Sequence, residues 1–555
     1  MPVAKERAEP ERSWTRADGL HVLALVAAVL LTWLPRLRGP IDLRFDAGVY
    51  YTLGTSLAEG RGYRLLNEPG EIQAVQYPPL LPALVAAHEL VLGSNDPLVV
   101  GPVLRATYFV FALAYALASY ALARRFVAGR LALAAALLSA LYFHAVYLED
   151  LLFAELPFAL AVLGLLLADG ARSRAGRASA YLCAAASFFL RTAGIAVLGA
   201  WALAALLARD WRAFAGRALL ALVSVGIWQA YVRSVTQGEE YSRPAYPYQR
   251  APYQYYNVSY AENVALLDPF RPEAGPITAF ALVERVGVNT LALASSLGET
   301  VCVPRGYWEW PLRKAGRVLG TYVPLKLAQV PILGLSALAL FGLALLWRRA
   351  RLVVLVLASS MLLIAITPWP AQFLRYLMPF APLAALSTVL ALSHLGTGRR
   401  ALVSAGLAVL LGAQVLCLRQ TFTHYHHEVE LPGAADAPRA GRHFFFEERR
   451  QWRALYAGIE WLRANTASDA RVATSCPLLV WLHAERKAVM PPLEADPDEA
   501  RRLLDSVPVD YLVIDALAFV DMSRRYAAPV VAADPAGWAE VFRAGEDVVI
   551  YQRVR

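Results

Sequence analysis

The sequence predicts a polytopic α-helical membrane protein with about eleven transmembrane helices and a C-terminal α/β domain outside the membrane. Of its 555 residues, 58% are hydrophobic and 17% are charged, whereas soluble chains carry about a quarter charged residues. Long apolar segments that do not meet water account for the difference. Positive charges lie in short clusters between these segments, which is a membrane-topology pattern. The net charge of +9 therefore does not indicate nucleic-acid binding.

The N-terminal part predicts a cytoplasmic tail followed by a retained membrane anchor. Residues 1–18 are polar and basic, and residues 19–35 form the first apolar run, which no Ala-x-Ala cleavage pattern closes. A first external loop is predicted at residues 36–97. Within it, the apolar segment 79–92 has about 14 residues, whereas a spanning helix needs roughly 20. We therefore expect this segment to lie in the membrane interface.

The positive-inside rule supports this topology. If residues 79–92 do not cross, all short basic loops fall on the same side as the basic N-terminus. An odd number of spans then places the N-terminus in the cytoplasm and the C-terminus outside the plasma membrane. The predicted spans are residues 19–35, 98–123, 131–148, 155–169, 178–190, 193–207, 216–234, 323–346, 352–368, 376–395 and 401–418.

Two larger external pieces complete the predicted organisation. Residues 235–322 form a loop that is rich in tyrosine and proline between positions 241 and 260. Residues 419–555 have the alternating helix and strand patterns of an extracytoplasmic α/β domain. The elements expected there are helices at 452–465 and 498–506 and strands at 471–474, 511–514 and 548–552.

A set of ionisable residues in or beside the spans lies on the predicted outer side. Such residues are costly in a membrane and usually mark function. A transporter or flippase of lipid-linked sugars would need polar groups near the membrane midplane, and the spans contain almost none. The pattern predicts chemistry or binding at the external surface. The acidic residues would transfer a proton or bind a metal ion, and the basic residues would bind a phosphate. The residues are Asp46, Glu149, Asp150, Glu155, Arg105, Arg191, Lys326 and Arg375.

Each of these residues also has a purely structural explanation. Asp46 could be a solvated loop acid paired with Arg44, and the other acids could cap helix ends. The basic residues could extend to the interface while their stems stay in the apolar layer. It is their convergence on one side that favours a functional site.

Several short motifs in this order resemble a known family. They are residues 45–50 around Asp46, Tyr77-Pro78-Pro79-Leu80, the acidic stretch 149–158, Arg191-Thr192-Ala193-Gly194, and Arg375-Tyr376-x-x-Pro379-x-x-Pro382. Together they resemble the GT-C glycosyltransferases that use polyprenyl-phosphate-linked sugars. The most similar branch holds the protein O-mannosyltransferases and the lipid A aminoarabinose transferase. The resemblance covers residues 15–420 and implies a GT-C-type transmembrane domain at 19–418.

The resemblance implies a reaction and a set of site residues. A sugar would pass from a polyprenyl-phosphate donor to a hydroxyl of a lipid, a cell-envelope glycan or a protein. The transfer would take place at the external face of the membrane, in contact with membrane lipids. One base on the acceptor hydroxyl suffices because a phosphate leaving group needs little protonation, and Asp46 would be that base, with inversion. Glu155 matches the second catalytic acid of the family. The implied substrate-binding residues are Arg375, Arg191, Lys326, Glu149, Asp150, Tyr376 and Tyr77.

A metal ion and two further points stay open. The aminoarabinose-transferase branch has a metal-binding acid where this chain has Gln76-Tyr77-Pro78, so no metal ligands are predicted, although Glu155 with its neighbouring acids would suit Mg²⁺ or Mn²⁺. The tyrosines of 241–260 would either stack on sugar rings and cover the site or form an interfacial aromatic belt. A non-catalytic membrane scaffold is the remaining alternative, and it would not depend on Asp46.

Overall fold

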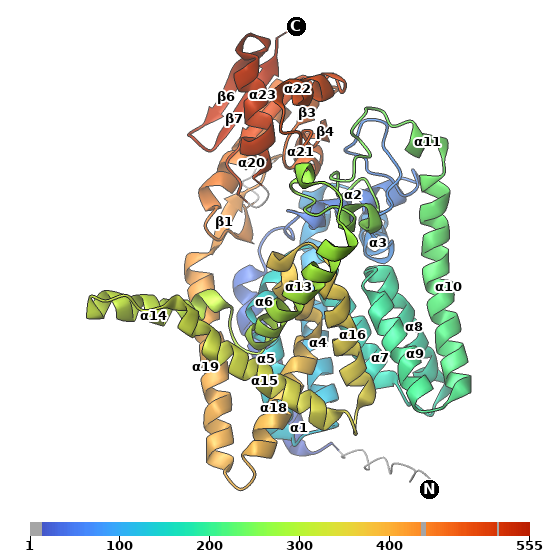
Figure 1. The fold of residues 1–555 in the computed structure, drawn as a ribbon, viewed down its shortest axis with the longest axis vertical. Helices are drawn as coiled ribbons and strands as arrows, with labels where there is room; N and C mark the ends of the chain where they lie inside the picture. Colours follow the sequence, from blue (N-terminus) through green and yellow to red (C-terminus); the bar gives the residue numbers. More distant parts are fainter. Residues whose placement is uncertain (1–13, 434–439, 519–520, 555) are drawn as a thin grey trace.

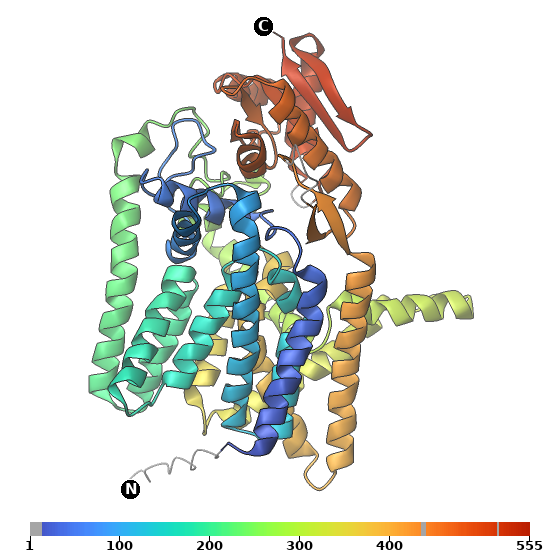
Figure 2. The same cartoon turned by 180° about the vertical axis from the view of Figure 1, so that it is seen from behind.

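A computed structural model describes residues 14–433, 440–518 and 521–554. It consists of a helical body and a small α/β domain set on one end of it (Figure 1). The N-terminal end of α1 and the C-terminal domain lie at opposite ends of the molecule in both views (Figures 1 and 2). The predicted fold class, a polytopic helical membrane protein with a C-terminal α/β domain, is confirmed.

The first half of the body contains the helices that carry most of the predicted motifs. α3 is the short apolar segment that was expected to lie in the interface, and it packs on α2. Gly54 allows this packing, because a Cβ there would lie 2.5 Å from the Cβ of Val85. The helices are α1 (Arg16–Trp33), α2 (Asp46–Ala58), α3 (Leu80–Leu92), α4 (Pro97–Arg124), α5 (Gly129–Ala140), α6 (Phe143–Leu148), α7 (Glu155–Ala168), α8 (Arg174–Leu190), α9 (Gly194–Leu207) and α10 (Trp211–Thr236).

The second half of the body begins with short helices and ends with a long helix that leads into the C-terminal domain. Between α13 and α15, helix α14 projects sideways from the bundle (Figures 1 and 2). The helices are α11 (Glu239–Ser242), α12 (Tyr260–Val264), α13 (Ala279–Thr300), α14 (Arg305–Leu319), α15 (Gln329–Leu346), α16 (Arg351–Ala365), α17 (Phe373–Leu377), α18 (Ala381–Leu395) and α19 (Arg400–His424).

Seven helical stretches among the described residues are long and apolar enough to cross a membrane. Five further helices are apolar but shorter, and the number of crossings, predicted to be about eleven, stays a prediction. The seven stretches are Arg16–Arg36, Pro97–Arg124, Trp211–Thr236, Ala279–Thr300, Leu325–Leu346, Pro370–Leu395 and Arg400–His424; the shorter helices are Leu80–Leu92, Gly129–Ala140, Glu155–Ala168, Gly194–Leu207 and Arg351–Ala365.

Two segments differ from the sequence prediction. The expected span 131–148 is two helices, α5 and α6, with a break in the backbone at Leu141 and Tyr142. The apolar composition continues across this break, so the sequence pattern did not reveal it. The expected external loop 235–322 contains α13, which is one of the seven long apolar helices and packs against α15, α16 and α17. Glu284 and Arg285 interrupt its apolar pattern and hide it from inspection of the sequence.

The C-terminal domain has a five-stranded sheet with the order β4-β3-β5-β7-β6. Strands β4, β3 and β5 are parallel, and β5, β7 and β6 pair antiparallel. The strands are β3 (Arg471–Ala473), β4 (Lys487–Val489), β5 (Tyr511–Asp515), β6 (Trp538–Ala544) and β7 (Val548–Arg553), and the helices are α20 (Arg449–Asn465), α21 (Pro477–Ala484), α22 (Pro497–Asp505) and α23 (Ala528–Ala533). The expected helices and strands of this region are all present.

A two-stranded ribbon joins α19 to this domain and was not predicted. It pairs β1 (His426–Glu430) antiparallel with β2 (Ala440–Phe444). Through this ribbon and α20, the C-terminal domain reaches the loop that precedes α2, and α21 packs on α2 itself.

Candidate active site

Two carboxylates begin helices at the end of the body that faces the C-terminal domain. Asp46 is the first residue of α2, and Glu155 is the first residue of α7. The free N–H groups and the dipole at a helix N-terminus stabilise a negative charge. The fold therefore places both carboxylates at helix N-termini, although 109 positions separate them in the sequence.

Two arginines connect these acids into one chain of ion pairs. Nη2 of Arg375 donates to Oδ2 of Asp46 at 2.6 Å, and its Nε donates to Oε1 of Glu155. Nη1 of Arg191 forms an ion pair with the same oxygen of Glu155. The side chain of Glu155 is fully buried, whereas that of Asp46 is 19% exposed. Two positive and two negative charges thus meet at one place, with Asp46 on the accessible side.

The position of Arg191 follows from the break between α8 and α9 at the Arg-Thr-Ala-Gly motif. Helix α8 ends at Leu190, Arg191 is extended, and α9 begins at Gly194. A Cβ on Gly194 would lie 2.5 Å from the backbone of Ser187 and Phe188, so only glycine permits this close turn between the two helices. The guanidinium of Arg191 leaves the turn and lies 5.6 Å from the ring centre of Tyr376.

Arg375 lies on α17, a one-turn helix between proline-rich breaks. Because proline cannot continue a helix interior, Pro370 and Pro379 divide the segment before α18 into short pieces. The guanidinium of Arg375 packs 4.0 Å from the ring centre of Phe153. The short helix is therefore held from two sides, by this ring contact and by the two acids.

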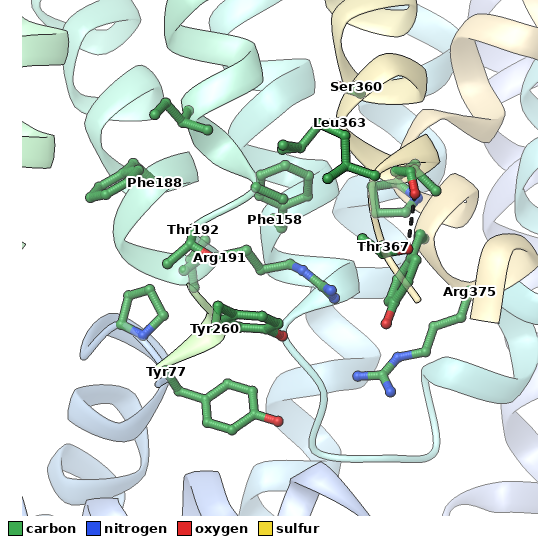
Figure 3. A pocket seen from close by; sticks show the side chains of 18 of the residues that line it. Tyr77, Phe158, Phe188, Arg191, Thr192, Tyr260, Ser360, Leu363, Thr367 and Arg375 are labelled. Carbon is green, nitrogen blue, oxygen red and sulfur yellow. Dashed lines mark hydrogen bonds between the residues drawn. The ribbon is translucent and has the colours of Figure 1, made fainter. Parts of the chain in front are cut away.

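A cavity of about 300 Å³ opens at this cluster. Arg191 and Arg375 extend into the same space, and Tyr77 and Tyr260 lie beside them (Figure 3). Among the described residues that line it, Asp46 is the acidic residue and the two arginines are the basic residues. The aromatic lining consists of Tyr50, Tyr77, Phe158, Phe188, Tyr260, Trp369, Tyr376 and Phe380, and the aliphatic lining includes Leu190, Ile195, Val225, Val264, Leu363, Ile364 and Ile366.

The structure brings five of the predicted site residues to this cavity and leaves the others outside its lining. Asp46, Arg191, Arg375, Tyr376 and Tyr77 line it. Glu155 does not line it, because the two guanidiniums lie over its carboxylate.

Glu149 and Asp150 belong to a second buried ion cluster. Nη2 of Arg36 donates to Glu149 at 2.8 Å and its Nη1 donates to Asp150 at 3.4 Å, while Nη1 of Arg105 lies 3.9 Å from Asp150. Neither acid lines the cavity, so their predicted contact with a substrate stays a prediction. Adjacent acids after a short helix look alike in sequence whether they face a cavity or pair internally.

Lys326 is exposed on the short 3₁₀ turn Leu325–Ala328 that precedes α15, and it does not line the cavity. Its predicted contact with the substrate phosphate stays a prediction, and the unforeseen helices α13 and α14 precede it in the chain. Among the described residues, no group of three or more metal-ligating side chains could hold a metal ion. At the place of the family's metal-binding acid, Gln76 donates from Nε2 to Asn263 at 2.8 Å.

Sequence inspection missed part of the cavity wall. Tyr50 lies one turn after Asp46 on α2 and lines the cavity. From the tyrosine-rich segment, Tyr260 also lines it, and the hydroxyl of Tyr256 donates to Oδ1 of Asp46 at 3.4 Å. The density of tyrosines between 241 and 260 was the available signal, but it did not show which of them face the site.

The helical membrane body with the C-terminal α/β domain above it has a fold similar to that of solved membrane glycosyltransferases of the GT-C type. No protein-family model and no curated protein matches the chain. Solved structures do match. The archaeal oligosaccharyltransferase AglB from Archaeoglobus fulgidus, in complex with an inhibitory peptide and a dolichol-phosphate, is 14% identical with a TM-score of 0.50 over 98% of this chain and 75% of AglB.

Two further GT-C enzymes match with lower scores. ArnT from Cupriavidus metallidurans, bound to undecaprenyl phosphate, is 12% identical with a TM-score of 0.41 over 98% of this chain and 99% of ArnT. The arabinofuranosyltransferase AftD from Mycobacteria is 15% identical with a TM-score of 0.46 over 98% of this chain and 40% of AftD. At these identities the likeness concerns the fold, and the chemistry has to be argued from the site.

Proposed function

We propose that this protein transfers a sugar from a polyprenyl-phosphate donor to an acceptor hydroxyl at the extracytoplasmic face of the membrane. The observation that carries the proposal is the cavity in which one accessible carboxylate and two guanidiniums meet within an aromatic and aliphatic wall. AglB, which has a similar fold, binds a dolichol-phosphate, and we extend that class of ligand to this chain.

Each part of a lipid-linked sugar has a chemical counterpart in the cavity. Guanidinium groups hold phosphates through fixed, charge-assisted hydrogen bonds, and Arg191 and Arg375 supply them. Aromatic rings bind the apolar faces of sugars, and Tyr77, Tyr260 and Trp369 supply such rings. Aliphatic residues of α9, α10 and α16 also line the cavity, which suits the first isoprene units of the lipid.

The proposed reaction is a single displacement with inversion. The acceptor oxygen attacks the anomeric carbon, and Asp46 takes the proton from the hydroxyl. The bond between the anomeric carbon and the phosphate oxygen breaks, and its electron pair stays on the phosphate. Arg375 and Arg191 stabilise the charge that develops there.

The ion pair between Arg375 and Asp46 gives the order of events in this proposal. In the structure, the guanidinium holds the Asp46 carboxylate at 2.6 Å. A donor phosphate competes for the same guanidinium, and the carboxylate is then freed to accept a proton. Glu155, buried behind both arginines, is assigned to holding them in place and not to the proton transfer.

The experiment that tests the function is sugar transfer by the purified protein in liposomes. Radiolabelled sugars on polyprenyl monophosphates are offered one at a time, with an envelope extract as the acceptor. We expect one donor to label a lipid, glycan or protein product, which also identifies the acceptor. Label that crosses the bilayer on its lipid and forms no new product would instead support a flippase.

A further inference from the structure

The residue before the candidate base has a backbone conformation that L-amino acids rarely adopt. Phe45 has φ 58° and ψ −136°, values close to the first central position of a type II′ turn, where glycine is strongly preferred. A non-glycine residue persists in such a conformation only when its surroundings hold it there. Phe45 immediately precedes Asp46, so its φ and ψ set the direction in which α2 begins.

The C-terminal domain supplies one set of these surroundings. The ring of Phe45 packs edge-to-face against Trp452 of α20, with 5.5 Å between the ring centres. The neighbouring Arg44 is buried, and its Nη2 donates to the carbonyl oxygen of Phe444 at 2.7 Å. The guanidinium of Arg44 also lies 4.6 Å from the ring centre of Phe445 and 4.9 Å from that of Trp452.

The membrane body holds the other side of the same short segment. The amide of Asp42 donates to the carbonyl of Asp150 at 3.0 Å, and the amide of Leu152 donates to the carbonyl of Asp42 at 3.2 Å. The Asp42 carboxylate accepts hydrogen bonds from Arg44. Burial raises the pKa of Asp42, but Arg44 and His443 outweigh it and lower this pKa to about 2.

Helix α2 itself is also packed closely against the C-terminal domain, two residues after Asp46. A Cβ on Gly48 would lie 3.0 Å from the Cβ of Leu478 and 3.6 Å from Cδ1 of Leu482, both on α21. The domain therefore contacts the start of α2 at two points, through Trp452 before Asp46 and through α21 after it. Asp46 lies between these two contacts.

We propose that Phe45 and Trp452 are positioning residues for Asp46, and that the C-terminal domain is part of the catalytic site through them. By holding Phe45 in a glycine-like conformation, Trp452 directs the first turn of α2 so that Asp46 meets Arg375. An ordinary conformation at residue 45 turns Asp46 away and breaks two hydrogen bonds, from the amide of Ala47 to the carbonyl of Arg44 and from the amide of Gly48 to that of Phe45. The expected effect on catalysis rests on the proposed function.

A pair of substitutions at residue 45 separates the backbone from the ring. Phe45→Ala and Phe45→Gly both remove the aromatic contact, but only glycine adopts a positive φ without cost. We expect Phe45→Ala to lower kcat by roughly tenfold or more while KM for the donor stays within about twofold. Phe45→Gly should keep most of the wild-type kcat. Equal losses in the two variants, or a larger loss in Phe45→Gly, would overturn the proposal.

Trp452 is substituted both in the wild type and in the Phe45→Gly variant. Trp452→Leu should lower kcat in the wild type, and it should cause no further loss when residue 45 is already glycine. Trp452→Phe keeps a ring and should restore most of the activity. Trp461, on the same helix, packs inside the domain against Tyr511 and Phe542, so Trp461→Leu is the matched control and should leave kcat unchanged. The same loss from Trp452→Leu in both backgrounds would contradict the proposal.

Amide hydrogen exchange tests the same geometry without any substrate. The amides of Ala47 and Gly48 should exchange faster in Phe45→Ala and Trp452→Leu than in the wild type, and at the wild-type rate in Phe45→Gly. If the wild-type protein transfers no sugar, the proposed function fails, while this exchange pattern still tests the positioning of Asp46 by Phe45 and Trp452. Unchanged exchange in Phe45→Ala would refute this positioning role even in an active enzyme.

Discussion

Nη2 of Arg375 lies 2.6 Å from Oδ2 of Asp46, and the Nε of the same guanidinium donates to Glu155. One side chain thus contacts both the candidate base and the acid behind it, using two edges of a planar group. A lysine ammonium is a point charge on a flexible stem and cannot reproduce this fork. The relationship makes Arg375 the residue through which donor binding and the base are connected.

Substituting Arg375 tests this connection. We expect Arg375→Ala to lower kcat/KM for the donor by about a hundredfold or more, because it removes a fixed positive charge next to the developing phosphate. Arg375→Lys should retain an intermediate activity. Initial rates over a range of donor concentrations measure both variants, and full activity in both would remove Arg375 from the phosphate site.

Glu155 and Glu149 form a matched pair of buried acids. Each is held by arginine, but only the arginines of Glu155 line the cavity. Breaking a buried ion pair costs about 3–5 kcal/mol, so Glu155→Gln and Glu149→Gln should both lower the thermal unfolding temperature. Only Glu155→Gln should also weaken binding of a polyprenyl phosphate, measured by titration in detergent. Equal loss of affinity in both variants would contradict the assignment of Glu155.

The sequence predicted the fold class, and it pointed to the residues at the centre of the candidate site, because both leave local signals. Apolar segments, basic loops and short motifs indicated the spans, Asp46, Arg191 and Arg375. It did not predict α13, whose apolar pattern is interrupted by Glu284 and Arg285, nor the placement of Lys326. The contact between Phe45 and Trp452 joins residues 407 positions apart, and no local pattern reports such a distant pairing.

Stability should depend on pH through His443, which is buried on β2. Burial lowers its pKa to about 3, and Asp42, which raises it, does not compensate. The unfolded chain binds a proton on this side chain below pH 6.5, whereas the native state does not. The contribution of His443 to the free energy of unfolding is therefore fully present above pH 6.5 and falls as the pH decreases. From pH 7 to 5 the loss should be about 2 kcal/mol.

The variant His443→Phe tests this dependence. Its ring suits the aromatic surroundings formed by Phe445 and Tyr456, and it cannot take up a proton. Thermal unfolding between pH 5 and 7 should therefore be flatter in the variant than in the wild type. The same slope in both proteins would assign the dependence to other groups.

Chelators should have at most a modest effect on transfer. The described residues include no cluster of three metal-ligating side chains, and Gln76 is engaged with Asn263. Transfer rates in the presence and absence of EDTA measure this directly. Complete inactivation that Mg²⁺ or Mn²⁺ reverses would show that a metal takes part in the reaction.

The most direct test of the account is the comparison of wild type with Asp46→Asn in liposomes containing a donor that the wild type uses. Asparagine keeps the shape of the side chain but cannot accept the proton. We predict that transfer by Asp46→Asn falls to background while binding of the polyprenyl phosphate persists, because Arg191 and Arg375 remain. Transfer at the wild-type rate by Asp46→Asn would show that Asp46 is not the base and would contradict the account.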